Sequence, residues 1–407
     1  MKVIALPGTL DTKGKEFRYV KDQIEKLGMK ALVIHTGVFE PTFEPDVSNE
    51  DVAKAAGYDL KQLVEKKDRA LATKALSEGM KALLPKLYKE GKFDGVLSFG
   101  GSGGTALVTP AMRELPLGVP KLMVSTMAGG NVSQYVGTSD IIMMPSIVDV
   151  SGINGLSNII YKNAVLAMAG MVGLKETLGA EETDTKPLVA ATMFGVTTPC
   201  VSRAQSYLEE RGYEVLVFHA TGNGGKTMEA LIKAGFFKGV LDLTTTEWCD
   251  EVVGGNLAAG PHRNEAAALA GVPQVVSVGA MDMVNFGPYD TVPKQFSGRN
   301  LYRHNPDVTL MRTTEEECRE IGERLAEKLN MVSGKTVLLL PLKGVSEIDM
   351  EGKPFYGPSE DAVLFETLKK NVDPSKVKIE ELDCNINAPA FAEYAAALLI
   401  DLMEGRG

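Results

Sequence analysis

Apolar strand-like runs alternate with amphipathic helical stretches along almost the whole 407-residue chain, and this alternation restricts the possible folds most strongly. In the first half, residues 3–6, 31–35, 95–99, 121–125 and 140–148 are predicted strands, and residues 15–27, 70–90, 106–115 and 155–178 are predicted helices. Strands that are separated by helices form parallel sheets with helices on both faces. The expected class is therefore α/β, with doubly wound, Rossmann-like parallel sheets.

The second half of the chain repeats the first. Residues 212–219, 237–241 and 272–274 match residues 28–35, 93–97 and 119–121, in the same order. Chance similarity between two such sheets is the alternative explanation. An acidic stretch that ends in proline, residues 179–187, is typical of a domain boundary. We therefore expect two tandem domains, residues 1–180 and 187–407, the second with a C-terminal extension, and an interdomain cleft that holds a site.

Composition narrows the classes of partner. The net charge of −10 argues against nucleic acid and anionic membranes, which both need a positive protein face. The four cysteines are scattered without a CxxC pair, so reduced thiols and a cytoplasmic location are expected. No run reaches the roughly 20 apolar residues that span a bilayer.

A glycine-rich turn follows the predicted strand 95–99. The stretch Ser98–Thr105 holds four glycines, Gly100, Gly101, Gly103 and Gly104, together with Ser102. Without Cβ atoms the backbone N–H groups can approach a ligand closely, and the start of a helix favours negative charge. The turn is neither a Walker A loop nor a clean Rossmann fingerprint. It nevertheless predicts phosphate or nucleotide binding.

Two further strand ends carry suitable chemistry. Residues 7–14 follow the first strand, and there Asp11 is a candidate Mg²⁺ ligand and Lys13 a candidate phosphate contact. The alternative for this stretch is that Thr12 caps the following helix. Residues 125–131 follow a third strand. The predicted cofactor-binding residues are Gly8, Thr9, Asp11, Thr12, Lys13, Gly100, Gly101, Ser102, Gly103, Gly104, Thr105, Thr126, Gly129 and Gly130.

These motifs carry a resemblance that covers essentially the whole chain. Residues 8–13, 98–105, 125–131, 259–263, 279–286, 303–306 and 341–349 are similar to those of the family related to the N-terminal, ATP-binding part of plant tobamovirus-resistance (tomato mosaic virus inhibitor) proteins. The resemblance implies two Rossmann-like domains, ATP with Mg²⁺ in the first, and a homodimer.

The second half lacks the glycine turn and has polar residues instead. We predict Glu247, His262 and Asp282 as catalytic residues, because a cleft with carboxylates and imidazoles suits general acid–base chemistry. The predicted substrate-binding residues, suited to an anionic small molecule, are Arg263, Asn285, His304, Asn305, Arg312, Lys343 and Ser346. A metal site of His262, His304 and Asp282 is an alternative. The predicted structural roles are a core position for Trp248 and helix capping for residues 315–317.

Three functions stay open at this point. The first is an Mg-ATP-dependent enzyme that acts on a small anionic substrate in the interdomain cleft. The second is a non-catalytic protein in which ATP sets domain closure or dimerisation. The third is a sugar-nucleotide or isomerase-type enzyme.

Overall fold

The computed structural model describes residues 1–174, 177 and 186–406. Two compact units make up the chain, Met1–Thr183 and Asp184–Gly407. The predicted boundary at residues 179–187 lies outside the described residues except for 186 and 187.

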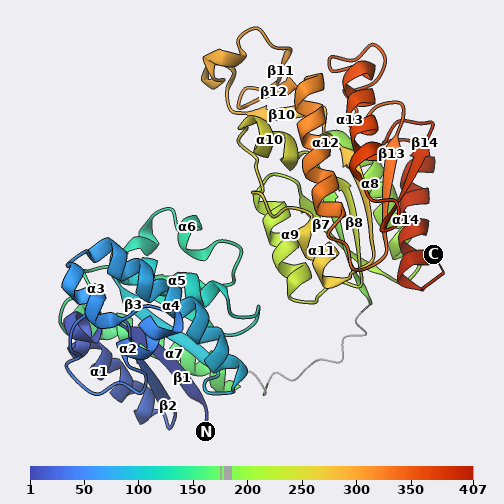
Figure 1. The fold of residues 1–407 in the computed structure, drawn as a ribbon. Coiled ribbons are helices and arrows are strands. Elements are labelled where there is room, and N and C mark those ends of the chain that lie inside the picture. The colour runs from blue at the N-terminus through green and yellow to red at the C-terminus, as the bar shows by residue number, and fades with distance from the viewer. Residues whose placement is uncertain (175–176, 178–185, 407) are drawn as a thin grey trace. The chain divides into compact units, whose positions relative to one another are not determined.

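The first unit is built on a five-stranded parallel sheet with the order β2-β1-β3-β4-β5. Strands β1, β2 and β3 are labelled in Figure 1. Its strands are β1 (Val3–Gly8), β2 (Lys30–His35), β3 (Gly95–Gly100), β4 (Lys121–Ser125) and β5 (Ile142–Pro145). Its helices are α1 (Leu10–Lys26), α2 (Asn49–Ala55), α3 (Leu60–Lys66), α4 (Arg69–Lys89), α5 (Ser102–Arg113), η1 (Thr126–Gly129), α6 (Ser133–Val136) and α7 (Gly155–Leu174).

Alternation of side chains along the strands gives this sheet two apolar faces. Ile4 and Leu6 pack with α1 and α7, whereas Ala5 and Val96 pack with α2, α4 and α5. Every residue of β3 is buried, as expected for a central parallel strand that is covered on both sides. The covered sheet leaves only its ends available to a ligand.

The second unit contains a six-stranded parallel sheet with the order β14-β13-β9-β8-β6-β7. Its strands are β6 (Leu188–Met193), β7 (Glu214–His219), β8 (Gly239–Thr244), β9 (Gln274–Gly279), β13 (Thr336–Pro341) and β14 (Val377–Leu382). A small antiparallel sheet, which the sequence did not predict, has the order β10 (Met283–Phe286), β12 (Val308–Arg312), β11 (Leu301–Asn305). The helices are η2 (Gly195–Thr197), α8 (Thr198–Glu209), α9 (Asn223–Lys233), α10 (Glu247–Val253), α11 (Glu265–Ala270), η3 (Tyr289–Thr291), η4 (Lys294–Phe296), α12 (Glu315–Leu329), α13 (Pro358–Asn371) and α14 (Pro389–Met403).

The two large sheets share one topology. Read from the other edge, the second sheet runs β7-β6-β8-β9-β13, which corresponds to β2-β1-β3-β4-β5 with β14 added at the end. The registers agree as well, since Ile4 pairs with Gly95 in the first sheet and Val189 pairs with Gly239 in the second. The predicted class, two tandem doubly wound parallel sheets, is confirmed.

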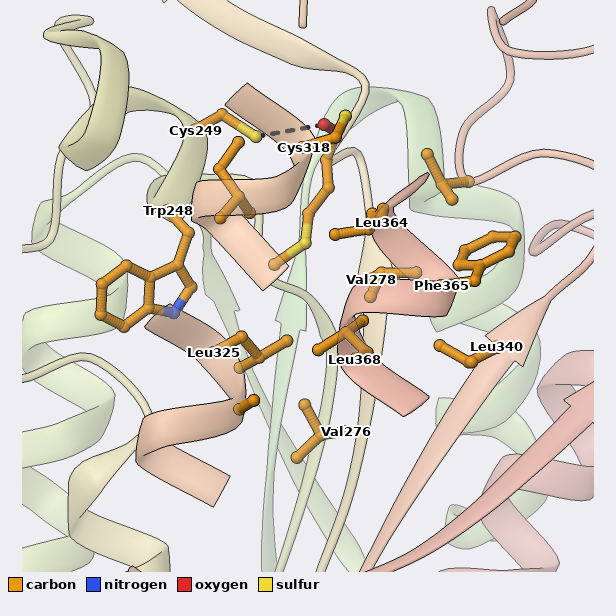
Figure 2. Close-up of a cluster of buried hydrophobic side chains, with 14 of the residues drawn as sticks. Trp248, Cys249, Val276, Val278, Cys318, Leu325, Leu340, Leu364, Phe365 and Leu368 are labelled. Carbon is orange, nitrogen blue, oxygen red and sulfur yellow. Dashed lines mark hydrogen bonds between the residues drawn. The ribbon is translucent and has the colours of Figure 1, made fainter. Parts of the chain in front are cut away.

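The core of the second unit includes the single tryptophan. Trp248 packs in a cluster with Cys249, Val276 and Leu325 (Figure 2), and its indole Nε1 donates to Asn264 Oδ1 over 2.8 Å. Thr314 and Glu317 form a capping box at the start of α12. The structural roles predicted for Trp248 and for residues 315–317 are therefore confirmed.

Several predicted boundaries were wrong in ways that concern the site. Helix α1 begins at Leu10 rather than Lys15, so Thr12 lies inside it and does not cap it. Helix α5 begins at Ser102 rather than Ala106, which places Gly103 and Gly104 in its first turn. Both loops are thus shorter than predicted. In the part of the chain that the structure describes, no helix is long and apolar enough to cross a membrane.

Candidate functional site

A cavity of about 810 Å³ lies at the carboxyl ends of β1, β2 and β3 in the first unit. We call it the first-unit cavity. The predicted residues that line it are Thr9, Asp11, Thr12, Lys13, Gly100, Gly101, Ser102, Gly103 and Gly104. The residues that line it without having been predicted are Thr36, Gly37, Val38, Phe39, Leu63, Val64, Lys67, Asp68, Arg69, Ala72, Thr73, Leu76, Leu107 and Asp149.

Three of the cavity's glycines have no reason within the protein to lack a side chain. A Cβ atom on Gly101, Gly103 or Gly104 would come no closer than 3.8 Å to any other group, and none of the three has a positive φ. Gly101 is the N-cap of α5, where glycine is a favoured residue, but Gly103 and Gly104 lie inside the helix, where glycine costs roughly 0.5–1 kcal/mol relative to alanine. At Gly103 and Gly104 the chain therefore accepts a cost that its own packing does not explain.

Other glycines near the cavity do have an internal reason. A Cβ on Gly8 would lie 1.7 Å from the ring of Phe17, and one on Gly37 would lie 2.3 Å from Asp11 Oδ1. Gly8 is buried and does not line the cavity, so its predicted ligand contact is replaced by a packing role.

The remaining predicted residues of this edge surround the cavity without lining it. Thr105 is buried, and its hydroxyl donates to Gly101 O over 2.8 Å and lies 2.6 Å from Ser125 Oγ. It therefore braces the glycine turn against β4. Thr126, Gly129 and Gly130 lie in or next to η1 and are not lining residues.

The start of α1 presents a cation and a carboxylate to the cavity. Lys13 has non-helical backbone angles (φ −126°, ψ 20°), so the helix is kinked there. Asp11 accepts main-chain hydrogen bonds on both oxygens, from Thr12 N at 2.8 Å and from Phe39 N at 3.2 Å. Asp11 thus ties α1 to the loop after β2.

That loop, residues 36–39, is fixed by buried side chains. His35 Nδ1 accepts from Leu10 N and Gly37 N, both at 3.2 Å, and its Nε2 lies 2.8 Å from Phe39 O. Asn49 Nδ2 donates to Gly37 O over 2.8 Å. His35 is thereby a structural residue. Like the other predicted loops, this one directly follows a predicted strand, so the same criterion could have identified it from the sequence.

The junction of α3 and α4 supplies two more cations, Lys67 and Arg69. Asp68 between them caps α4 by accepting from Leu71 N over 3.0 Å. No hydrogen bond or ion pair within residues 1–174, 177 and 186–406 engages the side chains of Lys13, Lys67 or Arg69. The sequence did not predict the α3–α4 junction as part of the site. Nothing in the sequence shows that the helices between β2 and β3 place this junction beside the carboxyl ends of the strands.

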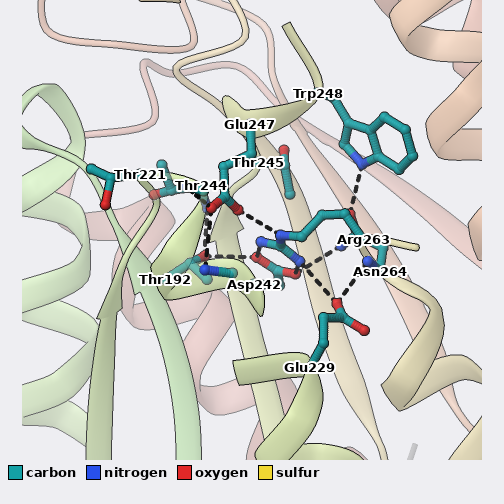
Figure 3. A network of polar contacts seen from close by, with 12 residues as sticks. Thr192, Thr221, Glu229, Asp242, Thr244, Thr245, Glu247, Trp248, Arg263 and Asn264 are labelled. Carbon is teal, nitrogen blue, oxygen red and sulfur yellow. Dashed lines mark hydrogen bonds and ion pairs between the residues drawn. The ribbon is translucent and has the colours of Figure 1, made fainter. Parts of the chain in front are cut away.

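The matching edge of the second unit is filled by its own side chains (Figure 3). Arg263, only 1% exposed, pairs with three carboxylates: Asp242 at 2.5 and 2.7 Å, Glu247 at 2.6 Å and Glu229 at 3.3 Å. We call these four residues the Arg263 network. Glu247 also accepts from Gly222 N and Gly225 N, at 2.7 and 3.1 Å.

Burial and ion pairing shift the pKa values of the Arg263 network in opposite directions. Burial alone would lower the pKa of Arg263, but Asp242 and Glu247 raise it well above its usual value. Burial raises the pKa of Glu229, an effect that Arg263 opposes. Glu247 and Arg263, predicted as catalytic and substrate-binding residues, are therefore committed to each other in the interior.

A second buried group surrounds Asp282. Ser346 Oγ donates to Asp282 Oδ2 over 2.7 Å, while Arg312 pairs with Asp361 at 2.7 Å and with Asp349 at 3.7 Å. Asp282 is fully buried, and burial together with the charge of Asp349 raises its pKa to about 7. The predicted residues Asp282, Arg312 and Ser346 do come together here, but as a buried cluster.

The other predicted residues of the second half are dispersed. His262 is 77% exposed and pairs with Glu265, while Asn285 bonds to the buried Asp250. His304 and Asn305 are exposed on β11, and Lys343 pairs with Asp383 on the surface. The alternative metal site is wrong, since the described ranges contain no group of three His, Cys, Asp or Glu side chains that could hold a metal ion.

Family models match both units. The N-terminal domain of the uncharacterised protein family UPF0261 matches residues 2–177, and the C-terminal domain of the same family matches residues 186–403. The chain belongs to this family. The resemblance expected from the motifs is confirmed.

Relatives align along almost the full chain. A UPF0261 protein of Clostridium tetani is 54% identical over 99% of both chains. ToMV resistance protein Tm-1(GCR237) of Solanum lycopersicum is 40% identical over 98% of this chain and 55% of the tomato protein. Among solved structures, UDP-N-acetylglucosamine 2-epimerase from Rickettsia bellii is 12% identical over 68% of this chain and 78% of its own, with a TM-score of 0.24. So low a TM-score supports no functional argument.

Proposed function

We propose that the first unit binds ATP, or a closely related nucleoside triphosphate, in the first-unit cavity. The observation that carries the proposal is the start of α5, where Gly101, Gly103 and Gly104 leave open space that the protein's own packing does not require. A polyphosphate that lies against the backbone is a direct reason for three such glycines.

The phosphate end of the ligand would lie between α5 and the three cations. The first N–H groups of α5 have no carbonyl partner inside the helix and point out of its start. Lys13, Lys67 and Arg69 line the same cavity. Backbone dipoles contribute only about 0.3–1 kcal/mol each, so these cations would supply most of the charge compensation.

The base end of the ligand would lie against apolar side chains. Leu63, Val64 and Leu76 from α3 and α4 line the cavity, as do Val38 and Phe39 from the loop after β2. A cavity with one apolar wall and one cationic end suits a molecule with a flat, weakly polar ring and a charged chain.

A Mg²⁺ ion fits this site through a single carboxylate and the phosphates, which is how the ion is usually held in nucleotide sites. Asp11 was the predicted ligand, yet both of its oxygens hold backbone N–H groups. Asp149 also lines the cavity, and no hydrogen bond or ion pair of its carboxylate is found among the residues described. We include Asp149 beside Asp11 as a candidate, with Mg²⁺ supplying charge neutralisation of the phosphates.

Calorimetry of the full chain with Mg-ATP tests the proposal. We expect one site in each chain and a rise in melting temperature, because a ligand that binds only the folded state stabilises it. The absence of heat and of any melting shift with every nucleoside triphosphate would refute the proposal. Asp149→Asn and Asp11→Asn, titrated with and without Mg²⁺, would show which carboxylate makes binding depend on the metal.

Turnover is a separate hypothesis from binding. Release of ADP with pooled small anionic substrates would support an Mg-ATP-dependent enzyme. A change between monomer and dimer on ATP addition, without ADP release, would support a regulatory protein, and sedimentation measures it. The homodimer implied by the family resemblance belongs to this proposal.

A further inference from the structure

We propose that Thr36 recognises a sugar hydroxyl of the nucleotide, so that the first-unit cavity distinguishes nucleotides by the hydroxyl groups of their sugar. The inference rests on the proposed function and adds to it the part of the ligand that the loop after β2 contacts. Thr36 follows the last residue of β2, lines the cavity and is only 1% exposed.

The hydroxyl of Thr36 is a buried polar group without a partner. Within the described part of the chain, its Oγ1 makes no hydrogen bond. An unsatisfied buried hydroxyl is costly, and in native proteins such groups call for a specific explanation. A ligand hydroxyl that pairs with it provides one.

Neighbouring polar groups of the loop already make hydrogen bonds within the protein, and the hydroxyl of Thr36 does not. Gly37 N and Phe39 N bond to His35 and Asp11, and the carbonyl oxygen of Gly37 accepts from Asn49. Three hydrogen bonds thus fix the backbone on the C-terminal side of Thr36. A rotation of about 120° around Cα–Cβ moves the hydroxyl to another staggered position, so the side chain can present it to a ligand without backbone movement.

The strand order of the sheet places Thr36 where the sugar of the ligand would lie. Strand β1 lies between β2 and β3, so the end of β2 is about 10 Å from the glycine turn at the end of β3. With the phosphates at the glycine turn, the sugar and base extend along the sheet edge toward β2. There Thr36 lies next to the apolar side chains of Val38 and Phe39, which also line the cavity.

The test compares four ligands and two variants by calorimetry on the full chain. Thr36→Val removes the hydroxyl and keeps the shape, whereas Thr36→Ser keeps the hydroxyl. We expect Thr36→Val to weaken ATP binding about tenfold, in line with one hydrogen bond, and Thr36→Ser to bind ATP as the wild type does. Either 2′-deoxy-ATP or 3′-deoxy-ATP should bind equally well to the wild type and to Thr36→Val, which would identify the paired hydroxyl.

Inorganic tripolyphosphate is the fourth ligand and reports on the phosphate end alone. Its affinity should be the same for all three proteins, and a loss in Thr36→Val would mean that Thr36 shapes the phosphate end instead, which overturns the inference. Equal ATP affinity in Thr36→Val and wild type also overturns it, while leaving the proposed function intact. If wild type binds neither ATP nor tripolyphosphate, both proposals fail. Melting curves verify that Thr36→Val is folded, and we expect no loss of stability because the hydroxyl has no partner to lose.

Discussion

The two units place opposite chemistry at matching strand ends. At the end of β3, Gly101, Gly103 and Gly104 leave open space beside cations that have no protein partner in the described structure. At the end of β8, Arg263 fills the equivalent edge and is paired with Asp242 and Glu247. The same strand order therefore supports one edge open to a ligand and one edge closed by the protein's own charges.

The glycines show the same difference on a smaller scale. In the second unit a Cβ on Gly225 would lie 2.2 Å from Glu247 Oε2, so that glycine is required by the protein's own packing. In the first unit the glycines of α5 have no such neighbour. The two edges therefore differ beside these glycines: the space next to Gly103 and Gly104 is open, whereas the carboxylate of Glu247 fills the space next to Gly225.

The largest expected effect is the loss of the central cation of the second unit. Arg263→Ala leaves three carboxylates buried without their partner, and we expect a loss of about 3–5 kcal/mol in the free energy of unfolding. Trp248 is the only tryptophan and lies in the second unit, so its fluorescence during urea unfolding reports on that unit. ATP binding by the first unit should be unchanged.

Arg324→Ala is the matched control for this variant. Arg324 pairs with Glu320 on the surface, with both side chains about half exposed, so its removal should cost at most about 1 kcal/mol. If Arg263→Ala were as stable as Arg324→Ala, the edge of the second unit would not be closed by ion pairing, and the contrast between the units would fail.

The next effect concerns the open edge. Gly103→Val adds a side chain to the first turn of α5 with no close neighbour except Arg69 Nη2 at 3.8 Å, so the fold should be kept. We expect ATP affinity to fall about 100-fold, because the side chain occupies the space of the phosphates. Gly170→Val on α7 also enters open space, outside the cavity, and should bind ATP normally. Normal binding by Gly103→Val would show that the glycine turn is not the phosphate site.

The sequence predicted the fold and the open edge of the first unit better than the closed edge of the second unit. Strand and helix periodicity and the repeat at residues 28–35 and 212–219 were sufficient to predict two copies of a doubly wound parallel sheet, whereas the strand order within each sheet came from the structure. Glycines signal an open turn through backbone chemistry, which is local and therefore visible in sequence. Polar residues such as Glu247 and Asp282 were predicted to be catalytic because residue type alone does not show whether a partner 16 or 64 positions away neutralises the side chain.

The stability of the second unit should depend on pH through Asp282. The pKa of buried Asp282 is raised from 3.8 to about 7, so between these values the unfolded chain loses this proton while the folded chain keeps it. This group therefore favours the folded state most at low pH, and its contribution falls as pH rises to about 7. Relative to wild type, Asp282→Asn should gain about 1 kcal/mol in stability for each pH unit between 5 and 7, measured by urea unfolding with Trp248 fluorescence. A pH-independent difference would contradict the raised pKa of Asp282.

The smallest effect tests whether the cavity's cations act on the ligand. Lys13 lines the cavity without a protein partner in the ranges described, so Lys13→Ala should weaken Mg-ATP binding about tenfold, the scale of one charge-assisted hydrogen bond. Lys15 lies two residues further along α1, exposed and outside the cavity, and Lys15→Ala removes the same charge at almost the same place. A contact at Lys13 predicts a loss in the first variant alone that persists at high salt, whereas a general field of the unit predicts equal, small losses in both that disappear as salt is added. Equal losses would leave the glycine turn as the phosphate site but remove Lys13 from it.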